Sequence, residues 1–336
     1  MKKILTLLLA LWMLTGCVAM AAGNQLVVGS TTAMSGAFFT DLFGSNTEDI
    51  DVRALLHAYI LMSWDNETGT YQINDSVVAG MAVSRDAQNN RVYTFDLYGD
   101  LKFSDGSAIT AKDYAFSILL TASPELAKLG GQSAAVGAIL GMDAYQSGKS
   151  SVLRGVRLLS DTQMSITISK AYEPYFYEMA LFDYSPYPIS VLAPGCNVVD
   201  TEKGVGIVNA GGTGNAIFTA ALLQKTILDA ATGYMSHPSV VSGPYTLTSY
   251  DAQRGTASFA INPYYKGNED GEKPTIETIV YRTVANDEAI DLLLSGEVDL
   301  LNKMVAADTI SKGIQSTADQ PFSVANYPRS GLSMIS

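Results

Sequence analysis

VYTFDLYGDLKFSDGSAITAKD, residues 92–113, is the stretch of sequence that decides the fold class. In its first part, residues 92–98, every second side chain is a large apolar one, at Tyr93, Phe95 and Leu97. Alternation of this kind predicts a β-strand with one buried face and one solvent-facing side.

The residues after this strand carry signals for a turn and for the start of a helix. Ser104-Asp105-Gly106 predicts a turn, because these residue types suit turn geometry. Thr110 comes before the helix and Asp113 follows three residues later, which is the spacing of a capping box. Residues 114–120 are apolar enough to be buried. The stretch therefore predicts a strand, a turn and a capped helix in succession.

The rest of the chain contains further strand-like and helix-like segments. Strands are predicted at residues 25–30, 163–169, 245–250, 257–261 and 276–283. Helices are predicted at residues 52–64 and 218–231, and between a cap at Asn286 and an end at Gly296. Residues 204–215 are rich in glycine and are expected to be irregular. Mixed strands and helices in this order favour an α/β architecture.

The composition is that of a large, acidic, folded protein. Of the 336 residues, 47% are hydrophobic and 16% are charged, which suits a buried core and argues against disorder. The formal net charge is −12 and no basic cluster offsets it, so a nucleic-acid partner is not expected. Cys17 and Cys196 are the two cysteines, too few for a disulfide framework. Core burial must therefore supply the stability.

Residues that could carry catalysis or hold a metal are scarce. The two histidines, His57 and His237, do not have the spacing of a metal site. No Gly-x-Ser-x-Gly turn marks a nucleophile, although a Ser-His-Asp triad built from distant residues stays open. The glycines in residues 204–214 are not followed by the Gly-Lys-Ser/Thr pattern that binds phosphate. We therefore expect a protein that is not an enzyme and that uses no metal or cofactor.

The N-terminus has the pattern of an export signal. Lys2 and Lys3 precede an apolar run that is too short to span a bilayer. Leu14-Thr15-Gly16-Cys17 then resembles a bacterial lipobox, which implies that residues 1–16 are a signal peptide and that Cys17 carries lipid. Residues 17–24 would be a lipid-anchored tether on the extracellular or periplasmic face of the cell membrane. The alternative is an ordinary cleaved signal with an accidental cysteine.

Three stretches in order along the chain resemble a known family. They are residues 93–113, residues 174–192 with Pro188-Ile189-Ser190-Val191-Leu192, and residues 242–299 with Ser242-Gly243-Pro244-Tyr245 and Asn262-Pro263-Tyr264-Tyr265-Lys266-Gly267. They are similar to the family 5 extracellular solute-binding proteins of ABC importers, the oligopeptide, dipeptide and nickel-binding group. The resemblance implies an α/β fold of the type II periplasmic-binding-protein kind, two-lobed and with mixed sheets. Members of that family are longer, so we expect a truncated member with an incomplete C-terminal lobe.

The resemblance also implies a division into domains. Domain I is expected to be discontinuous, and domain III only to begin. The expected limits are residues 25–68 and 187–305 for domain I, 69–186 for domain II and 306–336 for the start of domain III. Residues 197–240 have no counterpart that we can place in the family.

The function implied by the resemblance is the capture of extracellular peptides. Two lobes would close around a peptide, and the protein, a monomer, would deliver it to the membrane permease of an ABC importer. Hydrogen bonds to the main chain of the peptide would accept many sequences. The open alternatives are another ligand of the same transport class, a nickel complex or a sugar, and a surface sensor without transport. A secreted hydrolase is disfavoured, because the sequence has no acid pair or metal site that would favour one.

The candidate ligand-binding residues follow from the expected sheet. Ligands of α/β proteins bind at the carboxyl ends of the strands, so the loop after the first strand should face the cleft. A residue after the Gly243-Pro244 turn is a further candidate. The full set is Thr31, Thr32, Ser35, Phe38, Phe39 and Tyr245. The competing interpretation for each is a role in a loop or in the core.

Overall fold

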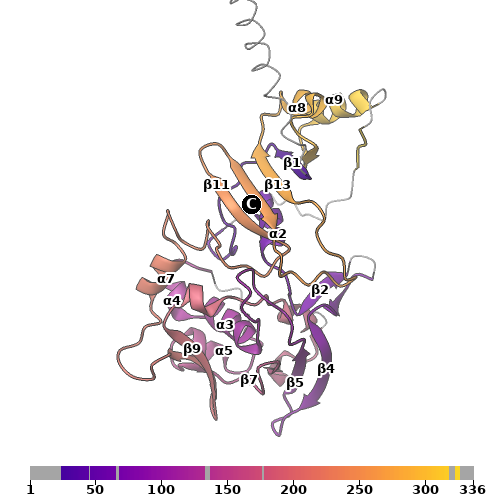
Figure 1. The fold of residues 1–336 in the computed structure, drawn as a ribbon. Coiled ribbons are helices and arrows are strands. Elements are labelled where there is room, and N and C mark those ends of the chain that lie inside the picture. Colours follow the sequence, from indigo (N-terminus) through magenta and orange to yellow (C-terminus); the bar gives the residue numbers. More distant parts are fainter. Residues whose placement is uncertain are drawn as a thin grey trace, which may run out of the picture.

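A computed structural model describes residues 24–44, 46–65, 68–132, 137–175, 178–317 and 322–325. The predicted signal peptide, Cys17 and residues 18–23 of the predicted tether lie outside these residues. The described chain forms two lobes, one above the other in Figure 1. The first lobe holds a five-stranded sheet, and the second lobe holds the other sheets and most of the helices.

The five-stranded sheet of the first lobe is mixed. Its strands in spatial order are β11 (Tyr245–Asp251), β12 (Thr256–Ile261), β13 (Thr278–Thr283), β1 (Gln25–Ser30) and β14 (Leu300–Asn302). β1 is parallel to both neighbours, whereas β12 is antiparallel to β11 and β13. Ser30, Thr283 and Asn302 lie in register, so the carboxyl ends of three strands meet at one edge. The strands predicted for this region are confirmed.

Both faces of this sheet are covered, which explains the apolar run in β1. Val28 belongs to the same hydrophobic core as Val52 of helix α2 (Thr47–Leu56). Val27 packs in a different core, with Ala289 of helix α8 (Ala289–Ser295). Successive side chains of a strand point to opposite faces, so a strand buried on both sides is apolar throughout.

Helix α2 begins five residues earlier than predicted and ends at Leu56. The Asn46 side chain accepts hydrogen bonds from two N–H groups of the first turn, and the Asp49 carboxylate accepts one from the Asn46 N–H. Tyr59 then has a φ of 61°, which a right-handed helix cannot contain. Strand β2 (Met62–Asp65) follows. The apolar spacing that predicted one helix is therefore divided between a helix and a strand.

Three antiparallel sheets build the second lobe. The four-stranded sheet has the spatial order β4 (Val78–Arg85), β5 (Arg91–Leu97), β8 (Gln163–Ile168) and β7 (Val156–Leu158). The three-stranded sheet has the order β6 (Val152–Leu153), β10 (Gly204–Asn209) and β9 (Cys196–Thr201). The third sheet pairs β2 with β3 (Thr70–Ile73). β5 and β8 are the strands that alternation predicted, and they pair with each other.

The strand-turn-helix unit forms as predicted. Gly106 has a φ of 84° and its N–H bonds to the Phe103 carbonyl, which closes the turn. Helix α3 (Ala111–Thr121) then begins after Thr110. The Asp113 carboxylate accepts hydrogen bonds from the N–H and the hydroxyl of Thr110, at 2.8 and 2.9 Å. Local signals are sufficient for this unit, because each contact joins residues only a few positions apart.

Residues 204–209 form a regular strand, although their glycine content predicted an irregular segment. Position 206 requires glycine because the neighbouring strand lies close to it: a Cβ on Gly206 would be 2.9 Å from the carbonyl oxygen of Ser151. The buried apolar side chains between residues 192 and 234 belong to the core of the second lobe. The same cluster holds Phe39, Leu42 and Tyr59, so it includes residues from both predicted parts of domain I.

The other helices are mostly short. They are α4 (Pro124–Ala127), α5 (Met142–Gln146), α6 (Ile189–Leu192), α7 (Ala220–Thr226) and α9 (Ala307–Thr317), with 3-10 turns at Lys170–Tyr172 and Glu178–Phe182. Helix α7 covers only the middle of the predicted segment. Glu288 rather than Asn286 precedes α8, and Gly296 ends it as predicted. In the part of the chain that the structure describes, no helix is long and apolar enough to cross a bilayer.

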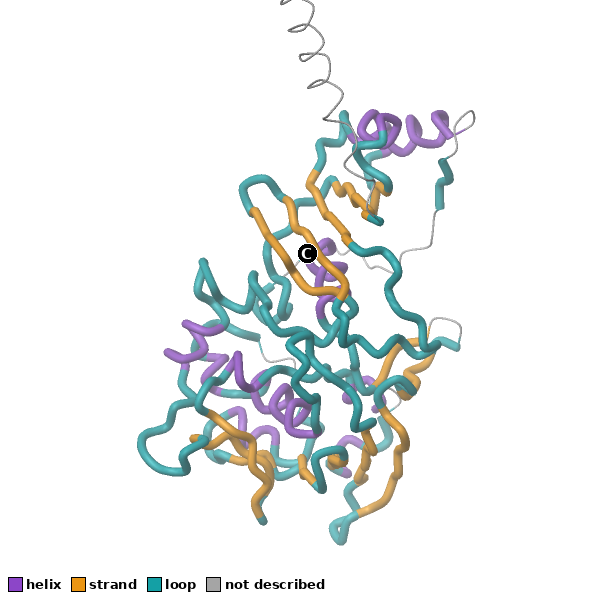
Figure 2. Tube along the Cα trace, viewed as in Figure 1, coloured by secondary structure: helices purple, strands orange, loops and turns teal. Residues whose placement is uncertain are grey.

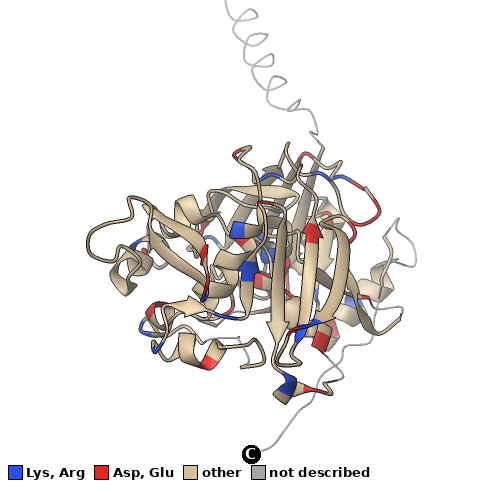
Figure 3. Cartoon of the chain, turned by 90° about the horizontal axis from the view of Figure 1, so that it is seen from below, with Lys and Arg blue, Asp and Glu red and all other residues tan. Residues whose placement is uncertain are grey.

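Loops connect most of these elements, and much of the second lobe is loop (Figure 2). Charged positions of both signs are spread over the described chain, as Figure 3 shows from below. Several oppositely charged side chains form pairs, such as Arg157 with Asp200 at 2.9 Å. The acidic net charge is therefore distributed over the molecule.

Candidate functional site

The loop after β1 starts at the sheet edge where three strands end. Thr31 and Thr32 are half-buried there, and the Thr32 N–H bonds to the Ser30 hydroxyl at 3.2 Å. Ser35 is exposed, but its N–H bonds to an Asp49 carboxylate oxygen at 2.9 Å and its hydroxyl bonds to the other. The start of this loop is thereby attached to the first turn of α2.

Three of the predicted ligand-binding residues are buried instead. Phe38 is fully buried in the first lobe and contacts Tyr250 edge-on, with 4.6 Å between ring centroids. Tyr245 is also in that core, and its hydroxyl donates to the Ile276 carbonyl at 2.9 Å. These two side chains have core roles, because their apolar surface is already covered. Phe39 is buried in the core of the second lobe.

Phe39 also lines a pocket of about 250 Å³ beside helix α2. The loop after β1, one side of α2 and the segment before α6 form its walls. We call it the α2 pocket, and its lining is Phe39, Thr40, Asp41, Ile50, Arg53, Ala54, His57, Ser185 and Tyr187. It joins residues from three distant parts of the chain.

The α2 pocket carries charges of both signs. Arg53 is half-buried, and its guanidinium donates to the Ala37 carbonyl at 2.7 Å. Asp41 is exposed. Burial, with a smaller contribution from the Asp41 charge, raises the pKa of the nearby Asp183 carboxyl. The lining of the pocket therefore includes one cation and one anion.

His57 lies between the α2 pocket and a second pocket. Its Nε2 donates to the Phe38 carbonyl at 3.0 Å, because a carbonyl can only accept. Burial, with a smaller contribution from Arg53, lowers the pKa of His57 to about 4. The imidazole is therefore neutral at neutral pH, and its Nδ1 is an acceptor.

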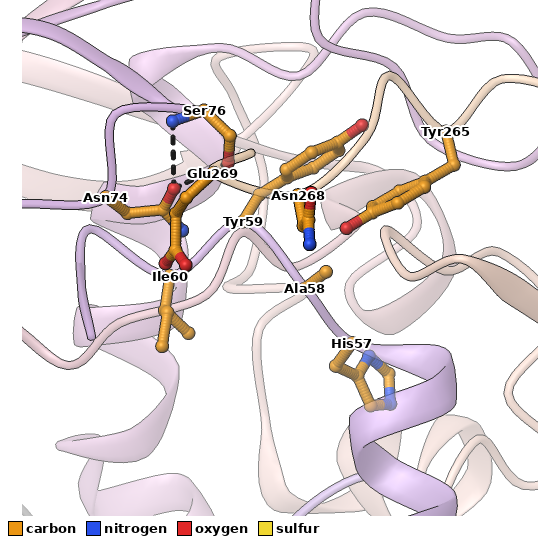
Figure 4. A pocket seen from close by; sticks show the side chains of 9 residues that line it. All are labelled: His57, Ala58, Tyr59, Ile60, Asn74, Ser76, Tyr265, Asn268 and Glu269. Carbon is orange, nitrogen blue, oxygen red and sulfur yellow. Dashed lines mark hydrogen bonds between the residues drawn. The ribbon is translucent and has the colours of Figure 1, made fainter. Parts of the chain in front are cut away.

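The second pocket, of about 190 Å³, is shown in Figure 4. We call it the tyrosine pocket. It is lined by residues 57–60, by Asn74 and Ser76 after β3, and by Tyr265, Asn268 and Glu269 after β12. The rings of Tyr59 and Tyr265 are stacked, with centroids 5.3 Å apart and planes 20° apart. Figure 4 shows these two rings on one side and Asn74, Ser76 and Glu269 on the other.

The sequence predicted an aromatic part of the α2 pocket, such as Phe39, but not the polar residues of the tyrosine pocket. Tyr265 falls within one of the stretches that carried the family resemblance, but no local signal singled it out. Within the described ranges, no group of three or more His, Cys, Asp or Glu residues is arranged to hold a metal ion.

Comparison with known proteins gives a family match over most of the chain. Residues 76–336 match the profile described as bacterial extracellular solute-binding proteins, family 5 Middle. The oligopeptide-binding protein OppA of Lactococcus lactis subsp. lactis strain IL1403 is 28% identical over 235 residues, 68% of this chain and 32% of that protein. The periplasmic oligopeptide-binding protein OppA of Escherichia coli K12 is 33% identical over 111 residues, 32% of this chain and 20% of that protein.

Solved structures give the same picture for the fold. Lactococcal OppA complexed with an endogenous peptide in the closed conformation matches with a TM-score of 0.61 and 19% identity, covering 89% of this chain and 48% of that one. Haemophilus influenzae OppA in complex with RPPGFSPFR matches with a TM-score of 0.57 and 16% identity, covering 89% and 49%. The chain thus spans about a third of the length of the first relative and about half of these solved chains.

Proposed function

Because the chain belongs to the bacterial extracellular solute-binding proteins of family 5, we propose that it captures peptides and delivers them to the permease of an ABC importer. The family consists of binding proteins and not of enzymes, as the sequence predicted. The fold is the predicted two-lobed α/β fold of the type II periplasmic-binding kind, with mixed sheets. We propose three things: that the ligand is a peptide, that an ABC permease receives it and that the protein is a monomer.

The α2 pocket is the observation that supports a peptide ligand. It lies where the loop after β1 meets α2, and it brings together residues from three distant parts of the chain. Asp41 can face a peptide ammonium and Arg53 a peptide carboxylate, while Phe39 and Tyr187 provide an apolar wall. We propose Thr31, Thr32 and Ser35 as the loop residues that face the same ligand.

Calorimetry on short peptides with free or blocked ends tests this assignment. Arg53→Gln should weaken binding of peptides with a free carboxylate about tenfold, because a charge-assisted hydrogen bond contributes about 1.5 kcal/mol. Asp41→Asn should weaken binding of peptides with a free ammonium to a similar degree. The matched control is Arg254→Gln, since the Arg254 side chain is 82% exposed in a remote turn. Changing the central peptide residues should have little effect.

Two results would overturn the proposal. If a nickel chelate or a sugar binds and no peptide does, the proposed peptide ligand is wrong. Only the proposal that the protein binds a solute for an importer then stands. If peptides bind but neither substitution distinguishes free from blocked ends, the α2 pocket is not their site. Thermal melting of each variant shows whether a loss of binding reflects unfolding.

The lipid anchor is a separate proposal that rests on residues 1–17. Cys17 follows a short apolar run and small residues, so we propose that it carries a diacylglycerol lipid. Radiolabelled palmitate should enter the wild-type protein and be absent from the Cys17→Ser variant. Equal labelling of the two proteins would contradict the assignment.

The division into domains is likewise proposed. We retain residues 25–68 and 69–186 as the starts of domains I and II, and residues 306–336 as the start of domain III. We also retain residues 187–305 as the second part of domain I, whose residues 192–234 pack in the same core cluster as Phe39, Leu42 and Tyr59 of its first part. Limited proteolysis of the folded protein should cut between the proposed domains. Cuts inside residues 192–234 should appear only after unfolding.

A further inference from the structure

The tyrosine pocket contains polar groups that the proposed peptide function does not use. The first is the amide of Asn74, a residue that is only 6% exposed. Its Oδ1 accepts hydrogen bonds from the N–H and the hydroxyl of Ser76, at 3.0 and 2.5 Å. A backbone N–H can only donate, so the atom facing it is the oxygen and Nδ2 is directed elsewhere. No described residue accepts from this Nδ2, which leaves a fixed donor at the pocket wall.

The second group is the carboxylate of Glu269, an exposed residue at the rim of the pocket. One of its oxygens accepts a hydrogen bond from the Ser63 hydroxyl at 2.8 Å. No described lysine or arginine pairs with this carboxylate. Beside it, the Tyr265 hydroxyl has no bond to any described residue, and burial, together with the charge of Glu269, raises the pKa of Tyr265 to about 12. A carboxylate beside an aromatic pair is an environment that attracts a cation.

The pocket wall is held in place before any ligand arrives. Tyr59 has a positive φ, and two hydrogen bonds hold it there. Its carbonyl accepts from the Tyr114 hydroxyl at 2.8 Å, and its hydroxyl accepts from the Lys266 N–H at 2.6 Å. A tyrosine in this backbone conformation is strained, and such strain persists where the surroundings determine it and often marks a binding site.

The charges around the pocket exclude an anionic ligand. None of its lining residues is a lysine or an arginine. Lys266 is adjacent in sequence, but its ammonium bonds to Asp100 at 2.8 Å and lies over the Tyr98 ring. His57 is neutral and offers an acceptor. The available groups are therefore one carboxylate, one neutral acceptor, one amide donor and the hydroxyls of Tyr59 and Tyr265.

We propose that the tyrosine pocket binds a small amine that also carries a hydroxyl or carbonyl oxygen. The ammonium pairs with Glu269 against the tyrosine rings, and the oxygen accepts from Asn74 Nδ2. A volume of about 190 Å³ is smaller than the pockets that bind drug-sized ligands, which start at about 300 Å³. The ligand is therefore the size of one sugar or one amino-acid derivative. This second site goes beyond peptide capture and does not depend on it.

Three sugars that share one ring and differ in charge test the proposal on the 336-residue chain. Glucosamine is cationic, glucose is neutral and glucuronate is anionic. Titrations followed by amide NMR shifts should show saturable binding of glucosamine with a Kd near or below about 1 mM. The shifts should lie at residues around the pocket, and glucose and glucuronate should bind at least about tenfold more weakly.

Two conservative variants and one control complete the experiment. Glu269→Gln should weaken glucosamine binding about tenfold and leave glucose unchanged, because only the charge is removed. Tyr265→Phe should weaken binding less, since it removes one hydroxyl and keeps the stacked ring. Asp270→Asn removes the neighbouring exposed carboxylate, which does not line the pocket, and should change nothing.

The proposal fails if glucose binds as tightly as glucosamine, or if Glu269→Gln leaves glucosamine binding intact. It also fails if no sugar gives a saturable shift up to about 10 mM, well above the expected Kd range. Peptide binding at the α2 pocket, measured on the same Glu269→Gln protein, should be unchanged, so failure of one site is distinguishable from failure of the other.

Discussion

The hydroxyl of Tyr114 donates a 2.8 Å hydrogen bond to the main-chain carbonyl of Tyr59. Tyr114 belongs to α3 and is fully buried in the second lobe, whereas Tyr59 follows α2 at the junction of the lobes. The bond thus connects the strand-turn-helix unit to the one strained residue of the tyrosine pocket. It satisfies a buried carbonyl whose direction is set by a positive φ.

Removing this hydroxyl should cost stability. Tyr114→Phe leaves the Tyr59 carbonyl without its buried donor, so the free energy of unfolding should fall by about 1–3 kcal/mol. Urea denaturation measures the change. Tyr145→Phe is the matched control, because its hydroxyl bonds to the Leu119 carbonyl elsewhere in the same core. Only Tyr114→Phe should also shift the amide NMR signals of residues around the tyrosine pocket. If both variants shift these signals, the Tyr114–Tyr59 hydrogen bond has no specific effect on the pocket.

The buried carboxylate of Glu178 should be one of the more important polar groups of the second lobe. It accepts from Arg91 at 2.6 Å and from the Tyr93 hydroxyl at 3.0 Å. Glu178→Ala removes the acceptor of the buried Tyr93 hydroxyl and leaves Arg91 with Glu173 alone, at 3.5 Å, so unfolding should become easier by about 1–3 kcal/mol. Arg254→Ala breaks an exposed pair and should change the free energy by less than about 0.5 kcal/mol. Equal effects of the two changes in chemical denaturation would contradict this ranking.

His57 should make the protein less stable in acid. Its folded pKa of about 4 lies below the unfolded value of 6.5, so the unfolded state binds more protons between these pH values. Stability should therefore rise from pH 4 to pH 6.5, by at most about 3 kcal/mol from this residue. In His57→Gln, stability relative to wild type should be highest near pH 4 and should decline as the pH rises. A constant difference across this range would show that His57 is not neutralised by folding.

Asp113 should have the opposite effect to His57 and make the protein less stable as the pH rises. Burial is the main cause that raises its folded pKa to about 6, above the ordinary value of 3.8, and the bonds from Thr110 partly offset it. The folded state binds the extra proton, so stability from this group falls as the pH rises from about 4 through 6, by up to about 3 kcal/mol. Asp113→Asn keeps an acceptor for the Thr110 N–H and removes the titration. Its stability relative to wild type should increase over that range in pH-dependent urea melts, and a decrease would refute the shift.

What could be predicted from the sequence depended on interactions between near neighbours. The turn at Gly106, the cap at Thr110 and Asp113, and the alternation in β5 each involve residues a few positions apart. The end of α8 at Gly296 is of the same kind. The family resemblance rested on these local stretches and on their order, which is why the fold class was also predictable.

The tertiary structure decided everything that depends on distant partners. α2 ends at Leu56 because the chain beyond it bonds to remote residues, such as Ala58 N–H to the Ser242 hydroxyl. The same long-range packing buries Phe38 and Tyr245, which the sequence placed in a cleft. Both pockets join segments more than a hundred residues apart, so their charge and shape arise only when these segments are brought together in the folded chain. No local pattern encodes such a pairing, because residues at that separation meet only through the packing of the whole core.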